Sequence, residues 1–180
     1  MPILGTVASQ FAGKPFSSFE SIATTTVGSG GTSNIEFTSI PATYTHLQIR
    51  VLHKNSTAGN GFDVQLNGDT TSGRYTIHAL VGDSSSASPV SNGSNNFGRF
   101  YGLSTQWGSA IIDILDYADT NKKRTVRALC GVDTTGSGVL SLNSFLYTQT
   151  AAVSSIKCFP SAGATWSEYS QFALYGIKGV

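Results

Sequence analysis

The stretch SQFALYGIK, residues 170–178, carries apolar side chains at both alternating sets of positions, Phe172 and Leu174 on one and Tyr175 and Ile177 on the other. Successive side chains of a β-strand point to opposite faces, so such a strand has no polar face. Strands of this kind lie in the middle of a sheet or between two layers. In Greek-key sandwiches the first and last strands can pair inside the sheet. We therefore expect this segment to be a closing strand that completes the core.

Alternating runs recur along the chain, whereas helical spacing of apolar residues is nearly absent. In YTHLQIRVLHK, residues 44–54, the side chains of Leu47, Ile49 and Val51 share one face. Four further strand-like segments are SIATTTV (21–27), SNIEFTS (33–39), GVLSLNSFLYT (138–148) and SSIKCFP (154–160).

Two pairs of strands are expected to form hairpins. GFDVQLNGD (61–69) ends in Asn67-Gly68, a strong signal for a tight turn, and RYTIHALVG (74–82) follows directly. GSAIIDILDYA (108–118) and KKRTVRALCGVD (122–133) flank a polar turn. Between the hairpins, the low-complexity segment DSSSASPVSNGSNN (83–96) is predicted to be an exposed loop.

About ten strands at regular spacing predict an all-β chain that folds as an antiparallel β-sandwich, jelly-roll-like in architecture. A length of 180 residues suits one sizeable core. We expect one sandwich domain over residues 21–180 and an extended N-terminal arm over residues 1–20.

The expected arm is apolar but follows neither the strand nor the helix period. It holds Ile3, Leu4, Val7, Phe11 and Phe16, interrupted by glycine and proline. An exposed segment of this composition would promote aggregation. The arm is therefore expected to lie on its own domain or to reach a neighbouring subunit, and these five residues are the predicted partner-binding residues.

Composition and charge exclude several classes of function. Only 12% of residues are charged and the net charge is +1, so we expect no binding of nucleic acid or of an anionic membrane. No apolar run is long enough to span a bilayer, and the N-terminus is a poor signal peptide. Cys130 and Cys158 lie in apolar strand-like runs and are expected to be buried free thiols of a protein made in a reducing cytoplasm.

The sequence contains no clear catalytic or metal-binding pattern. His46 and His53 lie seven positions apart on one predicted strand and so point to opposite faces, and HxH, HExxH and CxxC are missing. The acidic residues Asp113, Asp116 and Asp119 are expected on opposite strand faces and in a turn, which gives no facing pair for a glycosidase. We therefore expect no cofactor, no metal and no enzymatic activity.

The aromatic residues leave two interpretations open. Strand aromatics usually serve core and subunit packing, but they can also form a sugar-stacking platform on a sandwich face. The residues concerned are Trp107, Trp166, Tyr101, Tyr147 and Tyr169.

Four phrases of the sequence resemble a group of small β-rich virion structural proteins of tailed bacteriophages. They are ESIATTTVGSGGTSNIEFTSIPATYTHLQIRV, VQLNGDTTSGRYTIHAL, AIIDILDYADTNKKRTVRAL and FALYGIKG, and they extend over about residues 20–178 in the same order. The resemblance concerns layout and phrases, and it brings no site residues. It implies a structural component of the virion outside the major shell.

The first hypothesis is a capsid decoration, or cement, protein that binds the assembled shell and stabilises it. Its partners would be the major capsid protein or other virion proteins, and sandwich modules of this kind tend to associate as homotrimers. The alternative is a tail fibre, spike or collar-associated module that binds host-surface glycan. A glycan-degrading enzyme is the third hypothesis, against which the missing acid pair argues.

Overall fold

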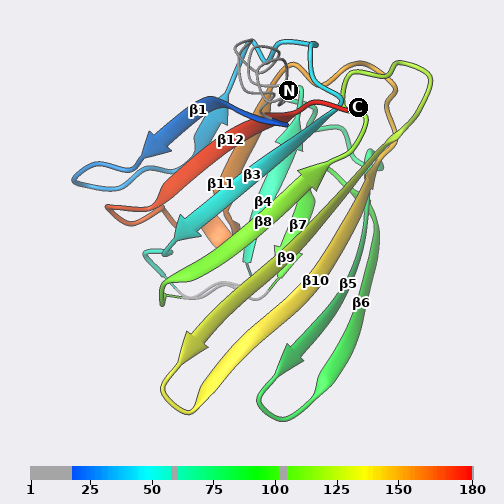
Figure 1. Ribbon diagram of the computed structural model, residues 1–180. Coiled ribbons are helices and arrows are strands. Elements are labelled where there is room, and N and C mark those ends of the chain that lie inside the picture. The colour runs from blue at the N-terminus through cyan, green and yellow to red at the C-terminus, as the bar shows by residue number, and fades with distance from the viewer. Residues whose placement is uncertain (1–17, 58–60, 102–104, 180) are drawn as a thin grey trace, which may run out of the picture.

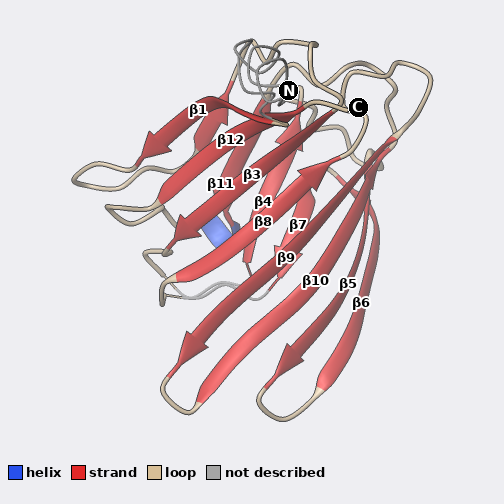
Figure 2. Ribbon diagram, viewed as in Figure 1, coloured by secondary structure: helices blue, strands red, loops and turns tan. Residues whose placement is uncertain are grey.

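The computed structural model describes residues 18–57, 61–101 and 105–179. Nearly all regular structure in this part of the chain is β-strand, and a single one-turn 3-10 helix spans Ser161–Gly163 (Figure 2). The strands are β1 (Phe19–Thr26), β2 (Ile35–Phe37), β3 (His46–His53), β4 (Gly61–Leu66), β5 (Tyr75–Asp83), β6 (Ala87–Asn95), β7 (Gly98–Tyr101), β8 (Gly108–Ile114), β9 (Arg124–Thr134), β10 (Ser137–Tyr147), β11 (Ile156–Pro160) and β12 (Gln171–Ile177).

The strands form two antiparallel sheets packed face to face, which confirms the predicted β-sandwich. The larger sheet has eight strands in the order β1-β12-β3-β8-β9-β10-β5-β6, and the smaller has four in the order β2-β11-β4-β7. Figure 1 shows the larger sheet in front of the smaller one, with β9, β10, β5 and β6 continuing past it. The front face of the larger sheet, called the outer face below, therefore points away from the sandwich core.

The C-terminal strand lies inside the larger sheet, as predicted. β12 pairs antiparallel with β1 on one side and with β3 on the other. Phe172 and Leu174 are completely buried in the core between the sheets, and Tyr175 lies half-buried on the outer face. The first and last described strands are thus hydrogen-bonded to each other, and neither sheet ends at β12.

The predicted hairpin over residues 108–133 is confirmed, since β8 and β9 pair antiparallel from Gly108 with Val132 to Ile114 with Val126. The predicted hairpin over residues 61–82 is wrong. β4 belongs to the smaller sheet, where it pairs with β11 and β7, and β5 belongs to the larger sheet, where it pairs with β10 and β6. The connection through Asn67 and Gly68 crosses from one sheet to the other.

The segment 83–96 is not an exposed loop, because β6 occupies most of it and pairs with β5. β6 is the last strand of the larger sheet, so most of its side chains are exposed although its backbone is hydrogen-bonded. Pro89 fits this place, because an edge strand tolerates a residue without an amide hydrogen.

The core between the sheets is aliphatic and aromatic. Its largest apolar side chains are those of Trp166, Tyr75, Tyr117, Phe62, Phe100, Phe145 and Phe172. Cys130 on β9 and Cys158 on β11 are buried and free, as expected, and burial raises the pKa of both thiols to about 12. The two cysteines lie on different sheets and form no disulfide with each other.

The expected arm lies largely outside the described residues, and so do its five predicted partner-binding residues. Strand β1 already begins at Phe19, so the last two positions of the predicted arm belong to the sheet. In the part of the chain that the structure describes, no helix has the length and apolarity that crossing a membrane requires.

Candidate binding surface

A row of aliphatic side chains crosses the outer face of the larger sheet. Strand pairing places Ile111 (β8) opposite Leu129 (β9), Leu129 opposite Leu142 (β10), and Leu142 opposite Leu80 (β5). These four residues, called the aliphatic row below, are each 44–59% exposed, and Leu140 beside them is 60% exposed. Directly opposed residues on one face of a sheet have their Cβ atoms about 5 Å apart, so the four side chains form one continuous strip.

The aliphatic row arises because β8, β9 and β10 each carry an aliphatic residue at an outward-facing position. Along β9, Val126, Ala128 and Cys130 point into the core, while Leu129 alternates with them and points outward. β8 repeats this pattern with Ile111, and on β10 Leu142 points outward between the buried polar residues Ser141 and Asn143. In a sheet with one solvated face the outward positions are normally polar. A run of exposed aliphatic residues at these positions is therefore typical of a surface that another apolar group covers.

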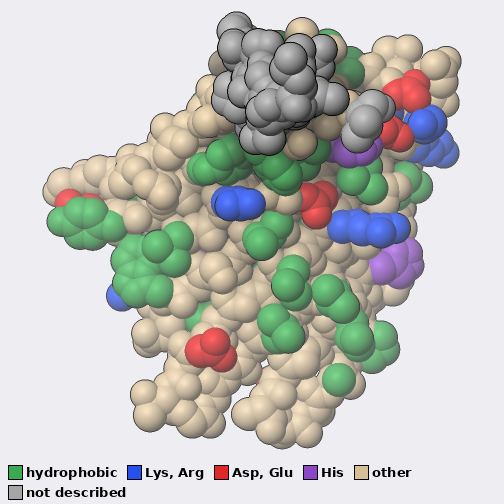
Figure 3. Space-filling view, viewed as in Figure 1, with side chains coloured by type: hydrophobic (Ala, Val, Ile, Leu, Met, Phe, Trp, Pro, Cys, Tyr) green, Lys and Arg blue, Asp and Glu red, His purple; other side chains and the backbone are tan. Residues whose placement is uncertain are grey.

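The aliphatic row forms the floor of a shallow groove of about 860 Å³ that runs over β8, β9, β10, β5 and β6. Its fifth strand contributes Pro89 and Val90. Figure 3 looks onto this face and shows hydrophobic side chains gathered over the lower half of the sheet, with charged groups beside them.

One side of the groove is polar. The neighbouring cross-strand row contains Asp113, Arg127, Ser144 and His78, paired in this order. The amide of Gln48 on β3 donates a hydrogen bond of 2.9 Å to Asp113. These groups border the groove as hydrogen-bonding partners and leave its floor aliphatic.

Arg50 continues the aliphatic row toward β1, because it pairs with Ile111. Its guanidinium carbon lies 5.9 Å from the centroid of the Phe19 ring and 5.5 Å from that of Tyr175. The outer face thus carries an aromatic–guanidinium cluster at its β1 end and aliphatic residues at its β5 end.

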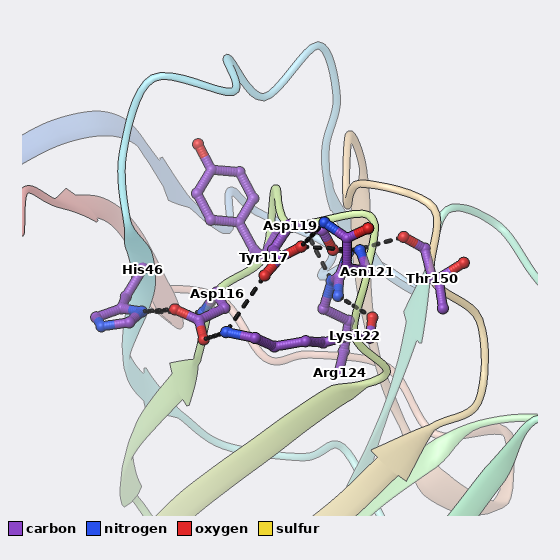
Figure 4. Close-up of polar contacts among 8 residues, drawn as sticks. All are labelled: His46, Asp116, Tyr117, Asp119, Asn121, Lys122, Arg124 and Thr150. Carbon is purple, nitrogen blue, oxygen red and sulfur yellow. Dashed lines mark hydrogen bonds and ion pairs between the residues drawn. The ribbon is translucent and has the colours of Figure 1, made fainter.

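A second polar cluster lies in the turn between β8 and β9 (Figure 4). The ammonium of Lys122 lies 2.9 Å from a carboxylate oxygen of Asp116 and 3.2 Å from one of Asp119, and the backbone amide of Asp116 donates to Nδ1 of His46. The Asp119 carboxylate also accepts hydrogen bonds from the backbone and side chain of Asn121. These contacts lower the pKa of Asp119, the Asn121 backbone amide first. The charges compensate one another within the turn.

The side chain of Arg124 stabilises this turn from its buried side. This side chain is completely buried and, within the described residues, its hydrogen bonds all go to backbone carbonyls, which are those of Tyr117, Lys122, Asp119, Thr150 and Ala151. Burial lowers the pKa of this guanidinium. Arg124 is thus a structural residue that ties the turn to the segment before β11.

The aromatic residues do not form one platform. Trp166 and Tyr147 are buried in the core, and Tyr101 is half-buried. Only Trp107 and Tyr169 are exposed, at the rim where β3 ends and β8 and β12 begin. The packing interpretation therefore holds for Trp166 and Tyr147, and a sugar-stacking surface made of all five residues is wrong.

The structure also shows where the histidine and acidic residues considered in the sequence lie. His46 and His53 do lie on opposite faces of β3, His46 half-buried near the turn and His53 fully buried in the core. Asp113 faces outward, and Asp116 and Asp119 both bind Lys122. Across residues 18–57, 61–101 and 105–179, no three histidine, cysteine or acidic side chains come together as a metal site.

Comparison with known proteins assigns this chain to no family. No protein-family model matches the chain, and no curated protein is detectably similar in sequence. Among solved structures, a protein of unknown function from Shewanella oneidensis MR-1 is 14% identical, over 90% of this chain and 77% of that one, with a TM-score of 0.30. An alginate lyase mutant in complex with alginate tetrasaccharide is 12% identical, over 89% of this chain and 98% of that one, with a TM-score of 0.27. Similarity at this level carries no argument about function.

Proposed function

We propose that this chain is a structural protein of a tailed-phage virion, a decoration protein that docks on an assembled protein shell through the outer face of its larger sheet. The observation that carries the proposal is the aliphatic row, Ile111, Leu129, Leu142 and Leu80. The resemblance of four sequence phrases to virion proteins supplies the virion as the location. The major capsid protein is the proposed partner, and residues of the N-terminal arm are a proposed second contact.

The chemistry of the groove favours a protein as its ligand. Its floor is aliphatic, and an aliphatic floor binds apolar side chains by removing their surface from water, at about 25 cal/mol per Å². The bordering groups Asp113, Arg127 and Ser144 offer both donors and acceptors, as the polar rim of a protein interface does. A sugar would need ring stacking or dense hydrogen bonding, and the aliphatic row offers neither.

An adsorption experiment tests this docking face. Purified full-length chain is mixed with undecorated shells, and the bound fraction is compared with that of a Leu129→Ser, Leu142→Ser double variant. Both positions are half-exposed, so the variant should fold normally. In the complex the interface would bury both leucines, so replacing them should weaken adsorption by at least about tenfold. The matched control is Leu52→Ser, an equally exposed leucine on the same face but outside the groove, so a loss confined to the double variant assigns adsorption to the groove.

If the double variant adsorbs as strongly as the unchanged chain, the outer face is not part of the docking interface. No adsorption by the full-length chain, together with its absence from purified particles, would reject the virion proposal. A low-resolution map of intact particles places the chain on the capsid or on the tail.

A specific observation favours a second candidate function, glycan binding by a tail-associated module. Tyr169 is 68% exposed and has a backbone φ of 69°, an uncommon conformation for a bulky residue. Its amide donates to the carbonyl of Val27 at 2.9 Å, which holds the backbone in place while the ring points into solvent. Strained exposed residues are frequent at ligand sites. Trp107, 42% exposed, lies on the same rim.

Binding of the isolated chain to host polysaccharide tests this candidate. Trp107→Ala and Tyr169→Ala should each lower the affinity, while the Leu129→Ser, Leu142→Ser variant should not. The two candidate functions therefore depend on different residues and can be separated with the same three proteins.

A further inference from the structure

A small pocket lies on the outward-facing side of the smaller sheet, over β11. The two sheets pack face to face, and the smaller one lies behind the larger one in Figure 1, so this side points away from the aliphatic row. The pocket, called the β11 pocket below, has a volume of about 260 Å³. The residues that line it are Ser33, Asn34, Gln65, Lys157 and Phe159.

Strand pairing explains why these five side chains meet. On β11, Lys157 and Phe159 lie at alternate positions and therefore share the outward-facing side of the sheet. Gln65 of β4 pairs directly with Lys157. On the other side of β11, Ser33 and Asn34 come immediately before β2. The floor of the pocket is thus β11, and its walls come from β4 and from the segment before β2.

The aromatic part of the pocket is held in place by three further side chains. The Phe97 ring lies edge-on to the Phe159 ring, with centroids 6.2 Å apart and an interplanar angle of 88°. The guanidinium carbon of Arg99 lies 4.9 Å from the centroid of Phe97. Arg99 in turn donates hydrogen bonds of 2.7 and 2.9 Å to the buried carboxylate of Asp63. A wall that is ordered before binding lowers the entropic cost of binding.

The amide wall of the pocket is ordered in the same way. Gln65 is only 8% exposed although it lies on the outward-facing side, and its amide nitrogen donates to the carbonyl of Asn96 at 3.1 Å. This bond fixes the plane of the amide, whose oxygen accepts no hydrogen bond from the described residues and can accept one from a ligand. Opposite it, Asn34 and Ser33 add a second amide and a hydroxyl, joined by a hydrogen bond of 3.2 Å.

Lys157 adds a positive charge to the pocket that no ion pair neutralises. Among the residues that the structure describes, no carboxylate forms an ion pair with its ammonium. The carboxylate of Asp63 is already bound by Arg99. Glu36 pairs with Lys157 across β2 and β11, but their charged groups stay apart. The ammonium can therefore bind an anionic group of a ligand, with a strong charge-assisted hydrogen bond.

The combination of these groups indicates the chemical class of the ligand. An apolar ligand would leave two amides, a hydroxyl and an ammonium without partners, which is unfavourable in a pocket. A sugar supplies hydroxyl groups to the amides and the C–H face of its ring to Phe159. A volume of about 260 Å³ suits a single sugar ring.

We propose that the β11 pocket binds one sugar residue that carries a carboxylate, a uronate, with Lys157 bound to the carboxylate. The ring packs on Phe159, and its hydroxyl groups bond to Gln65 and Asn34. The pocket shares no residue with the aliphatic row or with the rim of Trp107 and Tyr169, so this proposal rests on neither candidate function. A chain docked through its larger sheet would present the pocket to the surroundings.

An NMR titration of the isolated full-length chain tests the proposal. The probes are the methyl glycosides of glucuronate and galacturonate, with methyl glucoside and methyl galactoside as neutral counterparts. At least one uronoside should shift the amide signals of β11 and β4 saturably, with a dissociation constant of about 1–10 mM, as expected for so small a ligand. Its neutral counterpart should bind at least about fivefold more weakly, because it lacks the contact with Lys157.

Three variants assign the binding to this pocket. Lys157→Gln should weaken uronoside binding about tenfold, whereas Lys123→Gln makes the same charge change at an exposed lysine far from the pocket and should leave binding unchanged. Glu36→Gln removes the neighbouring negative charge and should strengthen uronoside binding about twofold. A misfolded variant cannot produce such a gain.

The absence of saturable binding by either uronoside would overturn the proposal, and so would undiminished binding by Lys157→Gln or an equal loss in Lys123→Gln. Equal affinity for the neutral glycosides would overturn the contact between Lys157 and a carboxylate. Uronoside binding should be unchanged in Trp107→Ala and in the Leu129→Ser, Leu142→Ser variant. Failure of the chain to adsorb to shells would leave these titrations unaffected, so this proposal and the proposed function fail independently.

Discussion

The imidazole of His53 lies edge-on against the indole of Trp166, with ring centroids 5.0 Å apart and an interplanar angle of 73°. Both side chains are completely buried between the sheets. Neither imidazole nitrogen has a hydrogen-bond partner within the described part of the chain, nor does the indole nitrogen of Trp166. The surroundings of His53 thus favour its neutral form, and burial lowers its pKa from 6.5 to about 4.

This burial predicts an acid-sensitive fold. In the unfolded chain His53 takes up a proton near pH 6.5, and in the folded chain only near pH 4, so the unfolded state binds more protons between these values. The free energy of unfolding should be highest above pH 6.5 and fall by about 3 kcal/mol as the pH drops to 4. Denaturant unfolding at half-unit pH steps measures it. In His53→Phe this part of the decline should vanish, and an unchanged decline would assign it to other groups.

The buried hydrogen bonds of Arg124 predict that this residue contributes strongly to the free energy of unfolding and has no role in binding. Arg124→Lys should lower the free energy of unfolding by about 3 kcal/mol, because one ammonium cannot reach carbonyls on both sides and several stay buried without a donor. Arg127→Lys is the matched control, on the same strand but exposed. Chemical denaturation compares the two. Equal stability of both variants would contradict the role assigned to Arg124.

The close contact between the sheets at Gly98 predicts that a larger residue at this position destabilises the fold. A Cβ at this position would lie 2.3 Å from the ring of Phe145 on the opposite sheet. Gly98→Ala should therefore cost about 2 kcal/mol, since a packed core cannot absorb the added methyl group without shifts. Gly93→Ala, where a Cβ meets no atom within 4 Å, should change stability little. A lower melting temperature for Gly93→Ala than for Gly98→Ala would contradict this packing.

The sequence predicted the fold class because alternation is local and strong. The apolar closing strand 170–178, the strand 44–54 and the hairpin 108–133 were all placed correctly, since each is fixed by its own side-chain pattern or turn. The hairpin 61–82 was predicted wrongly although its turn exists. Asn67 and Gly68 both have positive φ, but the Asn67 side chain binds Ala152 and Ser154, and the chain then crosses between the sheets. These partners lie far away in sequence, so no local pattern reveals the crossing.

The edge strand and the candidate surface were missed for different reasons. β6 has mostly exposed side chains, so alternation gives no signal, and only its pairing with β5 identifies it as a strand. The aliphatic row did have a signal, since Ile111 and Leu129 sit in stretches of β8 and β9 that are apolar on both faces. Knowing that only one of the two faces is covered required the order of the strands in both sheets.

The pairing of β1 with β12 makes a final prediction about where the chain can be shortened. Deleting residues 2–16 removes the segment before the sheet and should leave the unfolding transition cooperative, because every described strand is kept. Deleting residues 2–26 also removes β1, which leaves one edge of β12 unpaired and breaks the ion pair between Glu20 and Lys178. Unpaired strand edges promote association, so this variant should be less stable and should form oligomers in sedimentation experiments. If both truncated chains were equally stable and monomeric, β1 would contribute nothing to the closure of the sheet, and the domain would begin after residue 26.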